Sequence, residues 1–364
     1  MIKKRSKTFP GSVVIISLLL IILFAASLVA CKGPEPAATA KPITLVFSSH
    51  DPATGSWGET YNPFFKEIEQ RTGGKVKIEA HWGGELAGLF DAVNAAADGT
   101  VDMAHTLPTL APKSFPTEDV AALSSFDVAM LGSSQMHTEL TSMFPEMQAA
   151  YTRANLKLLF KVSTFPNYFF MTKGNAIRTF ADAKGKKFLS TGTWDSENWK
   201  AIGMVPTSLM PQETYTALQT GVVDGGVLTM PSLFDFGWGE VTPNVSMVNA
   251  RPAIWALVMN LKKWNTLPAE YQKIIEEAAA KVPALQDQIQ LRLDKELKPK
   301  ATQQWGSQYI TIPPEELAKF NAALKPVREK FVAQMNAAGF PGQKLVDEFL
   351  KLEKKYSDKK YGLK

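Results

Sequence analysis

Strand-like and helix-like segments alternate along the chain from Ile43 onwards. Short apolar runs are followed by stretches whose apolar positions recur at helical spacing, in the order 43–49, 57–71, 75–81, 86–97 and 101–105. Strand, helix, strand, helix and strand in succession predict an α/β fold with a parallel sheet. Such sheets bind ligands beyond the carboxyl ends of their strands. The residues after each strand are therefore pocket candidates: Ser49, His50, Trp57, Trp82 and residues 106–109.

The second half of the chain continues this alternation. Strand-like runs occupy residues 156–173, 188–191, 222–229 and 254–259, and the first of them is rich in aromatic residues. After Pro268 a helix-forming stretch runs towards Lys298, with Pro283 as a predicted kink or break. About 320 residues exceed what one hydrophobic core usually holds, so we expect two lobes.

The stretch Glu213–Pro231 combines a helix, a turn and a strand. Its first residues have apolar positions at helical spacing, Gly221 stands where a helix would end, and a short β-branched run with two glycines follows. We expect Tyr215 and Asp224 to shape this turn rather than to contact a ligand.

Several motifs of the chain occur in a fixed order. They are WGETYNPFFKEIEQRTGGKVKIEAHWGGELAG (57–88), GTVDMA (99–104), FADAKGKKF (180–188), YTALQTGVVDG (215–225) and NLKKWNTLPAEYQKIIEEAA (260–279). In this order they resemble the motifs of the solute-binding proteins of TRAP transporters, the DctP family. The resemblance covers roughly residues 43–300, and YTALQTGVVDG is its most specific part.

The resemblance implies a fold and its domains. We expect a two-lobed, periplasmic-binding-protein-like α/β fold with a hinge, a central ligand cleft and a long C-terminal helical segment. The expected domains are 43–165 (first part of lobe I), 166–253 (lobe II) and 254–364 (return to lobe I, long helix and C-terminal helices).

The first thirty residues have the pattern of an export signal. Four basic residues precede an apolar run at 13–29, and Leu28-Val29-Ala30-Cys31 resembles a lipobox. We predict a lipoprotein signal peptide at 1–30, lipidation of Cys31 and a flexible tether at 31–42 that is rich in Pro and Ala. The alternative is the start of a membrane helix, which needs about 20 residues.

Charge argues against a nucleic-acid partner. The formal net charge is +5, and the leader holds four basic and no acidic residues, so the exported chain carries +1. No basic block suggests a nucleic-acid footprint. The lysine-rich end at 351–364 is typical of a solvated tail rather than of a membrane-binding segment.

The sequence lacks the common catalytic motifs. Its histidines, His50, His81, His105 and His137, are far apart, and no nucleotide-binding or nucleophile motif occurs. We therefore expect no cofactor, no metal, no catalytic residue and no enzymatic activity. Cys31 is the sole cysteine, so no internal disulfide forms. An enzyme whose site assembles only in three dimensions is left as an alternative.

Three polar positions of the family are apolar in this chain. Carboxylate-binding members carry an arginine after the DlkG motif, whose planar guanidinium suits a bidentate pair with a carboxylate. Counted from Asp182, this position is Leu189. A second arginine, twenty residues earlier, corresponds to Phe169, and an asparagine after VDG corresponds to Leu228. A buried carboxylate without such partners loses several kcal/mol of solvation.

We therefore predict a ligand with a large apolar or aromatic part and at most one weakly charged group. The candidate lining residues are Trp57, Trp82, Leu107, Phe115, Phe165, Phe169, Leu189, Trp194, Leu228 and Met230. The alternative is that many of them are ordinary core. Of the arginines that could replace the missing clamp, Arg251 is better placed than Arg153 or Arg178, and Arg251 in the cleft would again favour an anionic ligand.

The resemblance also implies a function. We expect an exported, lipid-anchored binding protein that closes on one small organic molecule and delivers it to small and large TRAP membrane subunits. An ordinary carboxylate or dicarboxylate binder and a sensory binding protein remain as alternatives.

Overall fold

The computed structural model describes residues 41–123, 125–128, 131–209 and 211–357. The predicted signal peptide and Cys31 lie outside the described residues, as do most of the predicted tether and the last residues of the lysine-rich end. Residues 43–364 form one compact unit of mixed α/β structure with two sheets. No helix in the described ranges is both long and apolar enough to cross a membrane.

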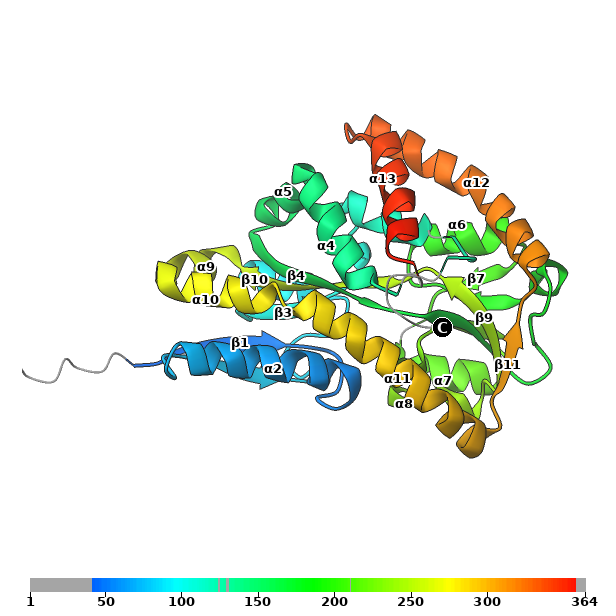
Figure 1. The fold of residues 1–364 in the computed structure, drawn as a ribbon, viewed down its shortest axis with the longest axis horizontal. Helices are drawn as coiled ribbons and strands as arrows, with labels where there is room; N and C mark the ends of the chain where they lie inside the picture. Colours follow the sequence, from blue (N-terminus) through cyan, green and yellow to red (C-terminus); the bar gives the residue numbers. More distant parts are fainter. Residues whose placement is uncertain (1–40, 124, 129–130, 210, 358–364) are drawn as a thin grey trace, which may run out of the picture. The chain divides into compact units, whose positions relative to one another are not determined.

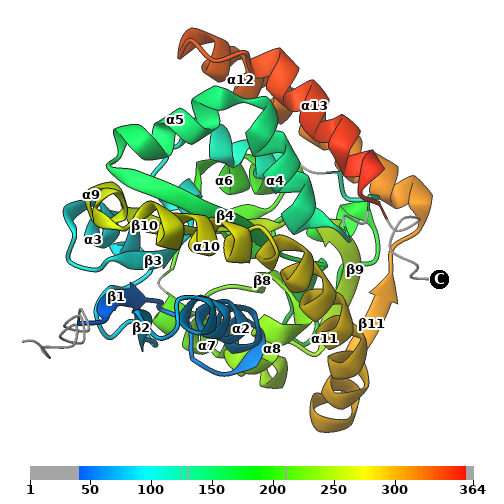
Figure 2. The same cartoon turned by 60° about the vertical axis from the view of Figure 1, so that its left-hand side comes forward.

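The first sheet has the strand order β2-β1-β3-β10-β4 (Figures 1 and 2). Its strands are β1 (Ile43–Ser48), β2 (Val76–His81), β3 (Met103–Thr106), β4 (Leu156–Thr164) and β10 (Ala253–Asn260). β1 pairs in parallel with β2 and β3, as the alternating pattern predicts, while β10 runs antiparallel to β3 and β4. The connecting helices are α2 (Gly55–Arg71) and α3 (Ala92–Asp98).

The second sheet has the order β11-β9-β5-β8-β6-β7. Its strands are β5 (Asn167–Met171), β6 (Lys187–Leu189), β7 (Val205–Thr207), β8 (Gly225–Leu228), β9 (Asn244–Ala250) and β11 (Gln308–Thr311). β6 is parallel to β7 and β8, β11 is parallel to β9, and β5 is antiparallel to β8 and β9.

The chain changes sheet at two short connections. β4 of the first sheet ends at Thr164 and β5 of the second begins at Asn167, while β9 ends at Ala250 and β10 begins at Ala253. Residues 254–364 were expected to return to the first lobe, but only part of this segment does so. After β10 and the following helices, β11 pairs with β9 and so belongs to the second sheet.

A long helix spans both sheets. α10 (Ala269–Ala279) is followed by α11 (Val282–Trp305), and Pro283 lies in the first turn of α11. Pro283 therefore marks a break, as the sequence predicts, because a proline is tolerated where the amide has no helical partner. α11 runs diagonally across the molecule and contacts α2 and β4 at one end and α8 at the other (Figure 1).

The remaining helices cover the sheets. They are α4 (Ser133–Met143), α5 (Pro145–Arg153), α6 (Thr193–Ala201), α7 (Pro211–Gln219), α8 (Met230–Asp235), α9 (Leu261–Thr266), α12 (Pro314–Ala337) and α13 (Gly342–Lys355). Short 3₁₀ segments are η1 (Pro108–Leu110), η2 (Pro116–Leu123), η3 (Phe180–Ala183) and η4 (Trp238–Glu240). α12 and α13 lie side by side and share an apolar cluster with η2 and α4 (Figure 2).

The stretch Glu213–Pro231 forms α7, a turn and β8. Gly221 has a φ of +73°, a conformation that glycine adopts without strain. Asp224 accepts a hydrogen bond from the backbone N–H of Lys187 at 2.8 Å, which ties the turn to β6. A Cβ on Gly225 would lie 2.5 Å from the carbonyl oxygen of Phe170, so this glycine allows the close approach of β8 to β5.

Candidate ligand-binding site

A cavity of about 170 Å³ is lined by residues from both sheets. Several lining residues follow the carboxyl ends of strands: Asp51 after β1, Leu107 after β3, Ser190 after β6 and Thr229 after β8. The carboxyl ends of strands are where α/β sheets bind ligands. An apolar cavity of about 150 Å³ holds benzene. The size of this cavity therefore suits a single ring with short substituents.

Five of the eleven expected lining residues lie on the wall of this cavity. They are Trp57, Leu107, Leu189, Leu228 and Arg251. Leu189 and Leu228 are half-buried and belong to β6 and β8. These are two of the three apolar residues that stand at polar positions of the family.

The other expected residues, Trp82, Phe115, Phe165, Phe169, Trp194 and Met230, do not line this cavity. The structure places Phe169 behind the wall of this cavity rather than on it. It is fully buried and packs edge-on against Trp199, with ring centroids 5.7 Å apart. Because Trp199 itself lines the cavity, Phe169 forms a second layer behind it.

Core packing accounts for the other five residues, of which Phe165 is buried. Trp82 packs edge-on against Phe47 in the core of the first sheet, and the Phe115 ring lies 4.5 Å from that of Tyr151. Met230 is buried in a cluster of the second sheet. Trp194 packs against Phe331 of α12 and lines a separate groove of about 660 Å³ that also includes Lys113 and Arg153.

Aromatic side chains form much of the cavity wall. They are Trp57, Trp199, Phe236, Trp238 and Trp255. Trp57 and Trp255 meet edge to face, with centroids 5.5 Å apart and an interplanar angle of 71°. Trp255 is also stacked on His50 at 5.3 Å. These contacts hold the rings in fixed orientations around the space.

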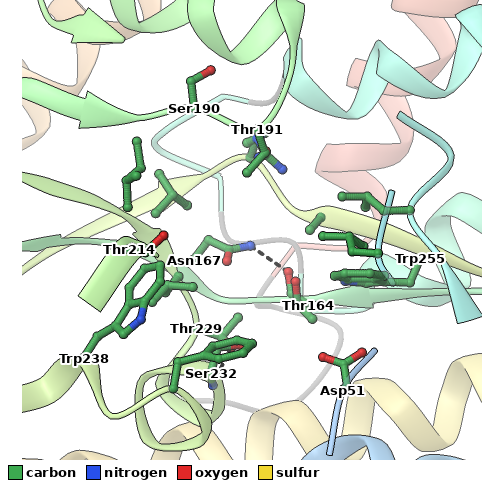
Figure 3. A pocket seen from close by; sticks show the side chains of 18 of the residues that line it. Asp51, Thr164, Asn167, Ser190, Thr191, Thr214, Thr229, Ser232, Trp238 and Trp255 are labelled. Atoms are coloured by element: carbon green, nitrogen blue, oxygen red, sulfur yellow. Dashed lines mark hydrogen bonds between the residues drawn. The ribbon is translucent and has the colours of Figure 1, made fainter. Parts of the chain in front are cut away.

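Asp51 is the acidic residue of the wall, and polar groups surround it. The hydroxyl of Ser49 donates to its Oδ2 at 3.3 Å. Nε2 of His50 lies 3.4 Å from Oδ1, and Nε2 of His105 lies 3.4 Å from Oδ2. Figure 3 shows the Asp51 side chain on the cavity wall, to which Ser232 and Trp255 also belong.

A buried hydrogen bond between Tyr61 and His105 fixes the proton positions behind Asp51. The hydroxyl of Tyr61 lies 2.5 Å from Nδ1 of His105. Burial raises the pKa of Tyr61 well above its usual value and lowers the pKa of His105 well below its usual value, so the phenol keeps its proton and the imidazole is neutral. The phenol then donates to Nδ1, which leaves the His105 proton on Nε2, facing Asp51.

Burial also affects the ionisation of the wall itself. Desolvation raises the pKa of Asp51 to about 7, a hydrogen bond from Ser49 opposes this rise, and the nearby Asp235 adds to it. Desolvation lowers the pKa of His50 to about 4, so its imidazole is neutral at pH 7. The Asp51 carboxylate therefore has no positive histidine beside it.

Arg251 is the basic residue of the wall, and it is already paired. Its Nε and one terminal nitrogen contact the carboxylate of Asp195 on α6, and the same terminal nitrogen donates to the Thr191 hydroxyl at 2.6 Å. The Thr191 hydroxyl donates to Asp195 Oδ2 at 2.7 Å. Arg251 is thus positioned at the cavity with a partner carboxylate rather than as a free cation.

Smaller polar groups complete the wall. Asn167 and Thr164 come from the β4–β5 connection, and the Asn167 amide donates to the Thr164 carbonyl oxygen at 2.6 Å (Figure 3). Thr229 and Ser232 come from the start of α8, where the two hydroxyls are 3.1 Å apart. The wall is therefore largely apolar, with polar groups where the chain changes element.

The sequence reasoning missed several wall residues, of which Asp51 and Trp255 matter most. Asp51 follows the predicted strand at 43–49, and the rule for strand ends reached its neighbours Ser49 and His50. Trp255 lies in the predicted strand near Arg251, but periodicity gives no sign of which face of a strand meets a ligand. Trp199 and Trp238 lie on helical segments and Phe236 in the turn after α8, all without a strand-end signal.

The described residues hold no group of three or more His, Cys, Asp or Glu side chains that could bind a metal ion. His50, His105 and Asp51 come together, but the imidazoles interact with each other, with Trp255 and with Tyr61.

Two sheets of α/β type with a ligand-sized cavity lined from both sheets are the architecture of an extracytoplasmic solute-binding protein. The model of the family "Bacterial extracellular solute-binding protein, family 7" (DctP) matches residues 47–335. The chain belongs to this family, which comprises solute-binding proteins of TRAP transporters.

Individual relatives agree with this assignment. A solute-binding protein of Verminephrobacter eiseniae is 25% identical over 285 residues, which cover 77% of this chain and 82% of that protein. A marine metagenome TRAP solute-binding protein described as specific for aromatic acid ligands has a TM-score of 0.78 and 21% identity, over 86% of this chain and 99% of that chain. One from Rhodoferax ferrireducens, in complex with copurified benzoate, has a TM-score of 0.78 and 23% identity, over 88% and 100%.

Proposed function

We propose that this chain captures a small organic molecule with an aromatic or largely apolar body and at most one charged group, and delivers it to the membrane subunits of a TRAP transporter. The observation that carries the proposal is the pair Leu189 and Leu228 on the cavity wall. Carboxylate-binding members of the family place an arginine and an asparagine at these positions. The aromatic wall and a volume suited to one ring support the same ligand class.

A dicarboxylate fits this cavity poorly for an energetic reason. Each carboxylate that leaves water without a cationic or multi-donor partner costs several kcal/mol. Arg251 already pairs with Asp195, and Asp51 adds a negative charge to the wall. Succinate would therefore place two negative groups in a cavity whose guanidinium is neutralised.

Capture would involve closure about the two connections between the sheets, residues 164–167 and 250–253. Wall residues come from both sheets, so the ligand contacts more protein in a closed form than in an open one and favours closure. The closed form would then dock on the membrane subunits. The chain itself would be a binder and not an enzyme, so it should release its ligand chemically unchanged.

The chain would be held at the membrane by a lipid on Cys31. The Pro- and Ala-rich segment 32–42 would act as a tether with a maximal reach of about 36 Å. Cys31→Ser should move the protein from the membrane fraction to the soluble extracytoplasmic fraction, whereas Lys32→Ser should leave it membrane-bound. Equal membrane retention of both variants would contradict lipidation at Cys31.

The ligand class is tested by thermal shift and calorimetry on the purified protein. Toluene, benzyl alcohol and benzoate serve as one-ring probes, and succinate and malate as dicarboxylate probes. We expect at least one one-ring probe to bind at least tenfold more tightly than either dicarboxylate. Tight binding of succinate that Arg251→Ala abolishes would overturn the proposal and favour an ordinary dicarboxylate binder.

A further inference from the structure

We propose that the ligand carries a positively charged nitrogen, which Asp51 binds while Trp57 and Trp255 contact the substituents of that nitrogen. The ligand class is thus an alkylammonium or arylalkylammonium ion with at most one ring. This inference rests on the proposed function, because it adds the sign of the charge to the aromatic or apolar body.

The charges around the cavity favour a cation. Apart from His50, the ionisable residues among the described lining residues are Asp51 and Arg251. Arg251 is matched by Asp195, so the pair contributes little net charge. Asp51 is left without a cationic partner, and the nearby Asp235 adds a second negative charge. The negative charge of the wall would repel a bound anion. A bound cation would instead pair with the Asp51 carboxylate, which has no cationic partner in the protein.

The groups packed around Asp51 stabilise a carboxylate rather than balance its charge. The Ser49 hydroxyl donates to it, and the neutral His105 turns its Nε2 towards Oδ2 at 3.4 Å. Tyr61 holds His105 in this tautomer by donating to Nδ1. The Ser49 hydroxyl and the nearby His105 Nε2–H reduce the cost of a buried carboxylate, but neither supplies a positive charge.

Titratable groups from four elements surround Asp51. The end of β1 supplies His50, β3 supplies His105, α2 supplies Tyr61 and α8 supplies Asp235. The two imidazoles are neutral at pH 7, because burial lowers the pKa of each. Burial raises the pKa of Asp51 to about 7. We expect such a raised pKa for a buried acid whose positive partner is part of the ligand rather than of the protein.

Aromatic faces beside this carboxylate strengthen the case for an alkylated nitrogen. Trp57 and Trp255 meet at 71°, so they form two sides of a corner, and both line the cavity with Asp51. A cation over an indole face gains about 0.5–2 kcal/mol, and aromatic cages bind methylated ammonium groups in this way. Phe236, just after α8, and Trp238 of η4 also line the cavity and are available to contact a ring or alkyl chain.

The test compares matched probes by calorimetry at pH 8. Benzyltrimethylammonium and neopentylbenzene have the same shape and differ by one positive charge, and benzoate supplies the opposite charge. We expect the cation to bind at least tenfold more tightly than the neutral isostere, and benzoate to bind most weakly. Asp51→Asn should remove at least tenfold of the affinity for the cation and leave that for neopentylbenzene within about threefold.

The pH dependence of the unmodified protein gives a second readout that requires no variant. The charge of benzyltrimethylammonium does not depend on pH, so its affinity should follow the ionised fraction of Asp51 and rise between pH 5 and pH 8. A carboxylate ligand that used protonated Asp51 as a donor would show the opposite slope. Leu345→Ala, far from the cavity in the α12–α13 cluster, controls for general destabilisation.

Each outcome decides between the two proposals. If neopentylbenzene or benzoate binds as tightly as the cation, or if affinity for the cation falls with rising pH, the cation inference is overturned while the aromatic ligand class stands. If succinate binds more tightly than every one-ring probe, both are overturned.

Discussion

The guanidinium of Arg251 is paired with the carboxylate of Asp195 at the edge of the ligand cavity, and both contact the Thr191 hydroxyl. Arg251 and Asp195 lie 56 residues apart in the sequence, on the β9–β10 connection and on α6. An arginine at a cleft is expected to favour anions, but a paired arginine does so only after its partner is removed.

Removal of that partner should change the ligand preference. Asp195→Asn keeps an oxygen that accepts hydrogen bonds but removes the charge, so the guanidinium becomes available to a ligand carboxylate. We expect benzoate to bind at least tenfold more tightly to this variant than to the unmodified protein, measured by calorimetry at pH 7.

The double variant Asp195→Asn with Arg251→Ala is the matched control, because it lacks the released guanidinium. It should bind benzoate no better than the unmodified protein. Equal gains in the single and double variants would show that the effect does not pass through Arg251.

Leu189 offers a second route to an anion site. Leu189→Arg places a guanidinium at the position that the motif count assigns to the arginine of carboxylate-binding family members, and Leu189 already lines the cavity. We expect at least a tenfold gain in benzoate affinity, and a loss of affinity for benzyltrimethylammonium because the new charge repels it. The control is Leu189→Met, which preserves an apolar side chain of similar volume and should change neither affinity by more than about threefold. An unchanged benzoate affinity in Leu189→Arg would contradict the assignment of Leu189 to the ligand wall.

The sequence predicted the local elements well because their signals are local. The alternation of strands and helices in the first sheet, the break before Pro283 and the turn after α7 each depend on residues close together in the chain. The strand-end rule also reached the cavity, since Leu107 follows β3 and Asp51 is one residue beyond the predicted candidate His50.

The layering of side chains could not be predicted in the same way. A residue count placed Phe169 at a ligand position, but Trp199 of α6 covers it, and nothing in either local sequence reveals that contact. The pairing of β11 with β9 likewise joins strands separated by more than fifty residues, so the return of the C-terminal segment was only partly foreseen. Contacts that are distant in sequence decide which side of a residue meets the ligand.

The buried acid Glu353 should make stability depend on pH. Burial raises the pKa of Glu353 to about 7, above its usual 4.5, even though the Ser125 N–H donates to it at 2.7 Å. The folded protein therefore holds this proton more tightly than the unfolded chain does. The unfavourable contribution is absent below about pH 4.5, grows as pH rises and is complete above about pH 7.

Glu353→Gln should remove that contribution. The free energy of unfolding, measured with urea at pH 5 and pH 8, should fall less with rising pH in the variant, by up to about 3 kcal/mol. The Gln side chain can still accept from Ser125 N–H. As a control, Asp347→Asn changes an exposed acid on the same helix and should leave the slope unaltered. Parallel pH profiles for the unmodified protein and Glu353→Gln would refute the assignment.

The buried ion pair between Lys161 of β4 and Glu118 of η2 should couple the two residues strongly. Lys161 Nζ on β4 lies 2.6 Å from Glu118 Oε2, both side chains are almost fully buried, and the Tyr151 hydroxyl donates to Glu118 Oε1 at 3.0 Å. Lys161→Met would leave the carboxylate buried without its cation. We expect a loss of about 3–5 kcal/mol in the free energy of unfolding, measured with urea at pH 7.

The double variant Lys161→Met with Glu118→Gln removes both charges and should be more stable than the sum of the single losses predicts, by at least about 1 kcal/mol. Lys157→Met is the matched control, because Lys157 lies on the same strand and pairs with Glu276 at 2.6 Å, but its side chain is partly exposed and that of Glu276 is exposed. Water already screens that pair, so its loss should cost about 1 kcal/mol or less. Additive losses at Lys161 and Glu118, or equal losses at Lys161 and Lys157, would show that burial does not govern the strength of these pairs.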